Sequence, residues 1–107
     1  MIVTSTDFVV NKKIVHQYGI VSGNTVRAKH VGRDIMAGWK SVFGGEIRGY
    51  TEMLAESRKE ALHRMVKEAQ ALGADAVINV RYTTSVVMQG ASEMLAYGTA
   101  VKVEDIS

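Results

Sequence analysis

Three histidines, His16, His30 and His63, are the side chains in this sequence best suited to bind a transition-metal ion. Zinc, copper and nickel sites use three or four converging ligands, often with two histidines four residues apart on one helix. These histidines are widely separated along the chain, so only the fold, or a symmetry axis that repeats one histidine from each subunit, could gather them. Two interpretations stay open: a site for a divalent metal ion, or three solvated or hydrogen-bonded histidines.

The sulfur-containing residues limit which metal sites and nucleophiles the chain can form. The sequence has no cysteine, which excludes disulfides, thiolate zinc sites and thiol nucleophiles. Thioethers can bind Cu(I), but most of the six methionines fall on apolar stripes, where methionine commonly fills cores and interfaces. We therefore interpret the methionines as packing residues.

A second polar group, Glu46, Tyr50 and Arg58, falls where two expected helices meet the expected sheet. A guanidinium that faces the core needs a carboxylate or carbonyl partner, so this group predicts a structural polar cluster. Gly44 and Gly45 precede a helix, as in a phosphate cradle, but Glu46 would repel an anion. A sharp link between two helices is the better interpretation of the two glycines.

No pattern in the sequence identifies a catalytic residue. The chain has neither GxxxxGK[ST] nor a GxGxxG after a strand, and it has no Gly-x-Ser-x-Gly elbow. The acid pairs at helical spacing, Glu52 with Glu56 and Glu56 with Glu60, belong to a solvated helix face. A non-enzymatic protein is favoured, and catalysis at a subunit interface is the alternative that no linear motif would reveal.

The formal net charge of +2 is too small to require a nucleic acid or a membrane surface as partner. Five basic residues are concentrated in the first third of the chain, where a solvated face is favoured over a phosphate-binding patch: Lys12, Lys13, Arg27, Lys29 and Arg33. The apolar runs are far shorter than the ~20 residues that a membrane-spanning helix needs. Because no secretory signal is visible either, we expect a cytoplasmic protein.

Two helices are expected in the middle of the chain, after β-type segments. Ile2 and Val3 predict a short edge strand, a turn follows at 11–13, and residues 14–28 predict a bent or bulged strand. Helical periodicity predicts helices over 30–43 and 50–72, each ended by glycine. The apolar stripe of the longer helix consists of Tyr50, Leu54, Ala61, Met65, Ala69 and Leu72.

The last third of the chain is typical of a β-hairpin, with strands over 76–88 and 93–103 and a turn at 89–91. Strict alternation puts six residues of the first strand on one face: Ala76, Ile78, Val80, Tyr82, Val86 and Met88. In the second strand, residues 95, 97, 101 and 103 alternate against 96, 98, 100 and 102. The fold class is therefore α+β: one domain over residues 1–107, ordered β-β-α-α-β-β, with helices on one face of an antiparallel sheet.

Self-association follows from the composition. A chain of 107 residues hides only roughly two-thirds of its unfolded surface, yet 47% of these residues are hydrophobic. The sheet face without helices is the expected place for the excess apolar surface. We expect another copy of the chain to cover part of it.

A set of short segments follows one another along the chain in a specific order: residues 18–23 (YGIVSG), 33–34 with 37–38, 44–45 with Tyr50, 72–77 (LGADAV), 94–95 and 98–101 (GTAV). The helix spacing Leu54, Arg58, Ala61, Met65, Ala69 lies between them. In this order the chain resembles the YbjQ-like family, small prokaryotic proteins described as heavy-metal-binding and of unknown function. The resemblance implies a dodecin-subunit-like fold assembled into a ring, as a homopentamer or a pair of pentamers.

The resemblance also bears on metal binding. Family members often carry acidic residues in the strand after the segment 72–77, whereas this chain has Asn79, Arg81, Thr83 and Thr84. A carboxylate cation site is therefore not expected there. The preferred function is a non-enzymatic binding or scaffold domain with a small ligand or ion at its subunit interfaces. The alternative is a heavy-metal-binding protein that uses histidines near a symmetry axis.

Overall fold

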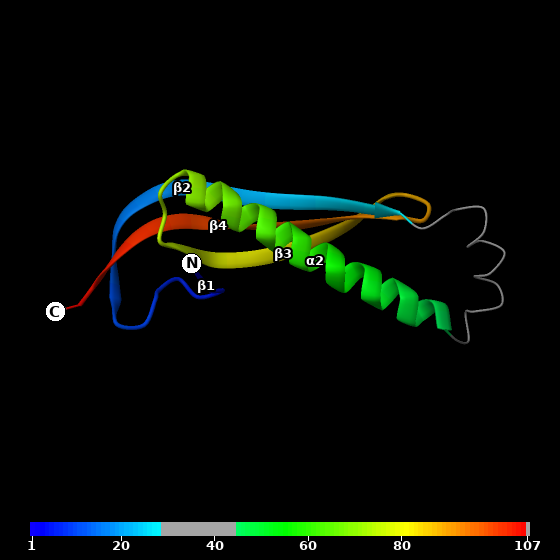
Figure 1. Cartoon of the computed structure of the whole chain (residues 1–107), viewed down its shortest axis with the longest axis horizontal. Helices are drawn as coiled ribbons and strands as arrows, with labels where there is room; N and C mark the ends of the chain where they lie inside the picture. Colours follow the sequence, from blue (N-terminus) through cyan, green and yellow to red (C-terminus); the bar gives the residue numbers. More distant parts are fainter. Residues whose placement is uncertain (29–44, 107) are drawn as a thin grey trace.

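The computed structural model describes residues 1–28 and 45–106, and for residues 45–50 it describes the backbone alone. The chain forms strands β1 (Ile2–Val3) and β2 (Lys12–Ala28), helix α2 (Gly45–Ala71), and strands β3 (Ala76–Met88) and β4 (Ala91–Asp105) (Figure 1). The helix expected over 30–43 lies outside the described residues. The described elements confirm an α+β fold with one helix and a four-stranded sheet.

The sheet has the strand order β1-β3-β4-β2, and it is mixed. Strands β3 and β2 both pair with β4 in the antiparallel sense, but β1 runs parallel to β3, with Ile2 beside Ala76 and Val3 beside Val77. The expectation of an antiparallel sheet was therefore wrong at β1. A strand of two residues has too short a pattern to encode its direction, which depends on the partner against which it lies.

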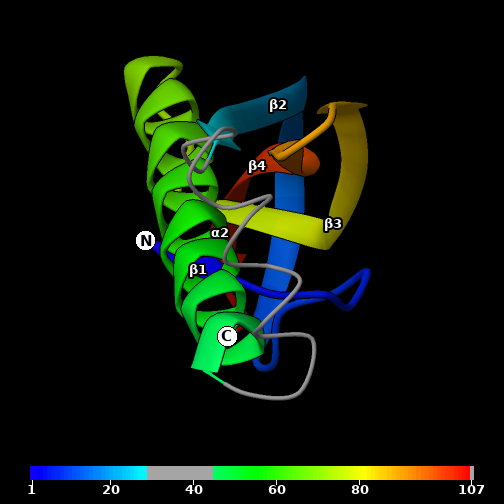
Figure 2. The ribbon, with the colours of Figure 1, turned by 90° about the vertical axis from the view of Figure 1, so that its right-hand side faces the viewer.

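Helix α2 lies over β2 and β4 (Figure 2). It packs on them through a stripe of small and flexible residues. Ala61, Met65 and Ala69 are four residues apart and fully buried, as the helical periodicity predicts. Leu72, which was expected to continue this stripe, lies beyond the end of the helix and is half exposed. The chain leaves the helix at Gly73, whose φ of 85° suits glycine, and the Ala74 N–H donates back to the Ala69 carbonyl.

A bulge in β3 divides the residues that strict alternation put on one face. Ile78 lies opposite Thr99 of β4, but Arg81 lies opposite Tyr97, so three steps along β3 match two along β4. Asn79 takes a φ of 54° at this irregularity. The expected single face was wrong because Ala76 and Ile78 pack on the face away from α2, whereas Val80 packs with the helix.

Among the described residues, the face away from α2 is covered at one end. There the loop between β1 and β2 places Val9 against a small second core of Ala76, Ile78 and Val101. The molecule measures 60 × 21 × 15 Å, with a radius of gyration of 17.7 Å. A compact chain of this length has a radius of gyration of about 13 Å, so the molecule is an elongated rod.

Candidate functional site

The described histidines do not meet. His16 is exposed on β2, with its ring edge-on to that of Tyr18 at 4.7 Å, and His63 is exposed on α2. His30 lies outside the described residues. Among the described side chains, those of residues 1–28 and 51–106, the structure contains no group of three or more His, Asp or Glu residues that could hold a metal ion. The described part of one copy of the chain therefore shows no histidine metal site.

Of the three residues in the expected polar cluster, the structure describes the side chain of Arg58 alone. Arg58 is exposed on α2, and the side chains of Glu46 and Tyr50 lie outside the described residues. An exposed guanidinium does not need a buried partner, because water solvates its charge. The cluster remains a prediction.

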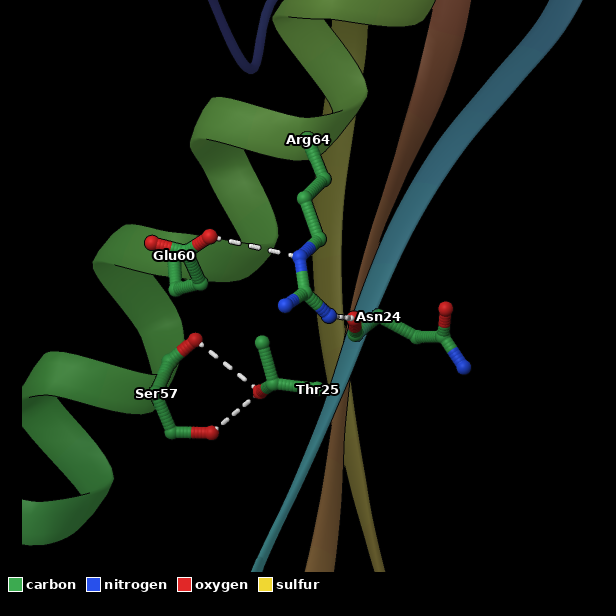
Figure 3. Close-up of polar contacts among 5 residues, drawn as sticks. All are labelled: Asn24, Thr25, Ser57, Glu60 and Arg64. Atoms are coloured by element: carbon green, nitrogen blue, oxygen red, sulfur yellow. Dashed lines mark hydrogen bonds and ion pairs between the residues drawn. The ribbon is translucent and has the colours of Figure 1, made fainter.

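A buried polar contact that the sequence reasoning missed joins α2 to β2. Thr25 and Ser57 are 3% and 1% exposed, and the Thr25 hydroxyl donates to the Ser57 carbonyl at 3.1 Å (Figure 3). The two hydroxyls are also hydrogen-bonded to each other. Since the Thr25 proton is already donated, the Ser57 hydroxyl acts as donor in the second bond. Both buried hydroxyls are thereby satisfied, which fixes the helix on the strand.

The signal for this contact was present in the sequence. Ser57 continues the stripe of Ala61, Met65 and Ala69 at the same spacing of four. Thr25 follows Val21 and Gly23 at the strand spacing of two, and all three are buried. A polar residue on an otherwise apolar stripe must find a hydrogen-bond partner, so the two stripes together identify the pair.

Charged side chains of α2 cover the outer edge of β2. Arg64 donates from Nη1 to the Asn24 carbonyl at 2.6 Å and from Nε to Glu60 at 3.3 Å (Figure 3). The Ser22 N–H donates to the Glu68 carboxylate at 3.5 Å. These contacts occupy backbone groups that point away from β4. An edge strand whose polar groups are occupied in this way is a poor template for another strand.

No described residue covers the far part of the opposite edge of the sheet. Beyond Arg81, whose guanidinium donates to the Ser5 carbonyl at 2.8 Å, no described residue pairs with the outer edge of β3. All residues from Arg81 to Met88 are exposed, and Val86 and Met88 are 77% and 63% exposed. This segment, which we call the distal half of β3, lies on the side of the molecule away from α2 (Figure 2).

The apolar side chains of the distal half lie on both faces of the strand. Tyr82 and Val86 occupy the face that α2 covers over β2 and β4, but both remain exposed. A helix is about 10 Å wide and strands are about 4.8 Å apart, so one helix covers about two strands. The exposed distal half is consequently the candidate interaction site of the chain.

One ion pair joins the ends of β2 and β4. Lys12 is hydrogen-bonded to Asp105, and this hydrogen bond and the charge of Lys12 lower the pKa of the Asp105 carboxyl below its usual range. Asp105 is largely exposed. The pair therefore stabilises the pairing of the strand ends only modestly.

The family described as "Putative heavy-metal-binding" matches residues 1–104. The chain belongs to this YbjQ family. Its YbjQ relatives include a UPF0145 protein of Photobacterium profundum, 61% identical over 95% of this chain and 99% of the relative. Another, from Archaeoglobus fulgidus, is 61% identical over 95% and 94% of the two chains. A third, from Thermotoga maritima, is 58% identical over 99% and 100%.

A solved structure has the same fold. It is a protein of unknown function of the DUF74 family from Pediococcus pentosaceus, with a TM-score of 0.69 over 97% of this YbjQ chain and 98% of that chain. The sequences are 20% identical, so the likeness concerns the fold alone. Among the described residues, the YbjQ chain has no helix long and apolar enough to cross a membrane.

Proposed function

We propose that the protein works as a homo-oligomer, without catalysis, and holds a small ligand or ion where its subunits meet. The observation that carries this proposal is the radius of gyration of 17.7 Å, well above the value of about 13 Å for a compact chain of this length. A rod with exposed apolar side chains along its strands gains stability when copies bury them together.

The distribution of exposed apolar residues supports the same proposal. One group lies near the chain ends, at Phe8, Val10 and Ile106, and another lies in the distal half of β3. Apolar regions at different places on one chain give it more than one surface through which copies can meet, and a head-to-tail contact between copies closes into a ring when the rotation allows it. A ring of five, or a pair of such rings, is the order that the family resemblance favours.

Light scattering and native mass spectrometry test the assembly. We expect a discrete oligomer at micromolar subunit concentration, and a stable monomer would contradict the proposal. Mass spectrometry of the native assembly, compared with the denatured chain, then measures any small molecule or ion that the subunits retain. An assembly that retains none, from cell extract or after incubation with divalent ions, would contradict the ligand-binding part.

A second candidate function is heavy-metal binding by histidines near a symmetry axis. It is favoured by the description of the family and by the exposure of His16 and His63, which leaves both imidazoles accessible to neighbouring copies. Incubation with zinc, copper or nickel should add metal in proportion to subunits. The triple variant His16→Ala, His30→Ala, His63→Ala should then lose this binding, and retention of the metal by that variant would contradict the candidate.

A further inference from the structure

We infer that two copies of the chain pair through the distal halves of their β3 strands, antiparallel and about a two-fold axis at Thr84. This inference deepens the proposed homo-oligomer, on which it rests, by naming the strand through which two copies meet. It is compatible with any ring, since a two-fold contact can join two rings or act alone.

The pairing of β2 with β4 determines which backbone groups of β3 have no partner on β4. Arg64 contacts the Asn24 carbonyl on β2 from the outer side. The backbone N–H and C=O groups of Asn24 and of its alternate neighbours therefore point away from β4, and those of Gly23 and Thr25 point toward β4. Their partners on β4, Ala96 and Met94, are therefore bonded to β2 rather than to β3. It follows that the residues of β3 opposite these two do not exchange hydrogen bonds with β4.

The residues of β3 opposite Ala96 and Met94 are Tyr82 and Thr84. Their N–H and C=O groups point to the outer edge, as do those of Val86 by alternation. The Val80 N–H confirms this direction, because it donates to the Thr4 carbonyl on the outer side at 3.0 Å. Three consecutive outward residues thus lack a partner among the described parts of the chain.

An edge of this kind is rarely left open. Native sheets protect edges with lysine, proline, inward charges or a covering helix. The outer edge of β2 has such protection from Arg64 and Glu68. The distal half of β3, with sequence RYTTSVVM, has no proline and only one charge, at its first residue. Its composition favours strand pairing, and this edge has to be covered for the protein to avoid aggregation.

The distal half of β3 is complementary to a second copy of itself, which identifies that copy as its partner. When two distal halves pair antiparallel around Thr84, Tyr82 lies opposite Val86 of the other copy, and Thr84 lies opposite its own equivalent. Aromatic with β-branched and Thr with Thr are both favourable cross-strand pairs. The outward groups of these residues also face one another, as hydrogen-bonded pairs require.

The same register suits the other face of the strand. Thr83 lies opposite Ser85 of the other copy, and Arg81 lies opposite Val87. The only charged residue of the segment therefore avoids its own equivalent, and like charges are not opposed. No single-residue shift of the register keeps the outward groups facing each other, because it would pair outward residues with inward ones.

Cysteine cross-linking tests this register, since the chain has no cysteine of its own. Thr83 and Ser85 form a non-hydrogen-bonded pair across the axis, where Cα atoms lie about 4.5 Å apart and a disulfide fits. We expect Thr83→Cys and Ser85→Cys chains, refolded together and oxidised mildly, to give a cross-linked heterodimer. Each variant alone should give at least tenfold less, because equivalent positions lie about two residues apart along the strand.

The control is a mixture of Gln70→Cys with Ser85→Cys, in which one thiol lies on the exposed face of α2. Equal cross-linking in this mixture would show non-specific collision and overturn the inference. A wild-type chain that is oligomeric by light scattering, with no Thr83–Ser85 cross-link, would overturn this pairing but leave the proposed function standing. A monomeric wild-type chain would overturn both.

A proline variant provides an independent measurement. Thr84→Pro removes an outward N–H and no backbone hydrogen bond to β4, so it should weaken the two-fold contact at least tenfold, since two hydrogen bonds are lost per contact. Thr84 also donates from its hydroxyl to the Glu93 carbonyl at 2.9 Å. Thr84→Val is therefore the matched control, because it loses that bond and keeps the N–H. Equal dissociation constants for the proline variant and the wild-type chain, with unchanged circular dichroism, would overturn the inference.

Discussion

Gly23 on β2 lies against the backbone of Ala61 on α2, so closely that a β-carbon at position 23 would overlap the Ala61 carbonyl oxygen. The same β-carbon would lie 2.7 Å from the Cβ of Arg64. Helix and strand therefore meet backbone to backbone at this point. This contact brings Ser57 within hydrogen-bonding distance of Thr25 and Arg64 within reach of the β2 edge.

Replacing Gly23→Ala should move the helix off the strand. Overpacking at a rigid backbone contact costs about 3 kcal/mol of the unfolding free energy. Chemical denaturation of the purified variant measures this loss. Ser22→Ala, one residue away and not beneath the helix backbone, is the matched control and should change stability by less than about 0.5 kcal/mol. Equal stability of the Gly23→Ala variant and the wild-type chain would contradict the close approach.

The hydroxyl pair of Thr25 and Ser57 should behave as one unit. Thr25→Val leaves the buried Ser57 hydroxyl without its partner, and we expect a loss of about 1–2 kcal/mol in the free energy of unfolding. Ser57→Ala should cost about as much. The double variant should lose less than the sum of the two, because no buried hydroxyl is then left unsatisfied. Additive losses in denaturation experiments would show that the two hydroxyls act independently.

The Lys12–Asp105 pair should be visible as a pH effect. Lys12 lowers the pKa of Asp105, so the pair stabilises the folded chain at neutral pH. That contribution is lost as the pH falls through the lowered pKa and the carboxylate takes up a proton. Carboxyl-carbon NMR titration of Lys12→Ala should show the Asp105 pKa raised toward its usual range.

Lys13→Ala is the matched control for this titration. It removes the same charge one residue along β2, but Lys13 takes no part in the lowering of the Asp105 pKa. Its effect on that pKa should be clearly smaller, and added salt should reduce the difference between the two variants because the pair is exposed. Equal shifts in both variants would indicate a general charge effect in place of a specific pair.

The sequence by itself determined the elements that depend on near neighbours. The spacing of Ala61, Met65 and Ala69 predicts the buried stripe of α2, and Gly73 predicts where the helix ends. The turn at 89–90, where Gly90 takes a φ of 79°, confirms the expected hairpin. These features follow from periodicity and glycine conformation, which act over a few residues.

The family was also determined by the sequence, from the order of short segments. The candidate metal and polar-cluster residues stay predictions. His16 and His63 lie apart, and neither histidine spacing nor composition could indicate that, because convergence of ligands depends on how the elements pack.

Only the tertiary structure decided the direction of β1, the bulge at Asn79 and the contrast between the two sheet edges. The bulge moves Arg81 to the face of Ile78, and it arises from pairing with β4 across a long sequence separation. Strand partners and edge contacts are settled by residues far along the chain, whose positions a local pattern does not encode. For that reason the exposed distal half of β3 emerged from the fold and not from the residues alone.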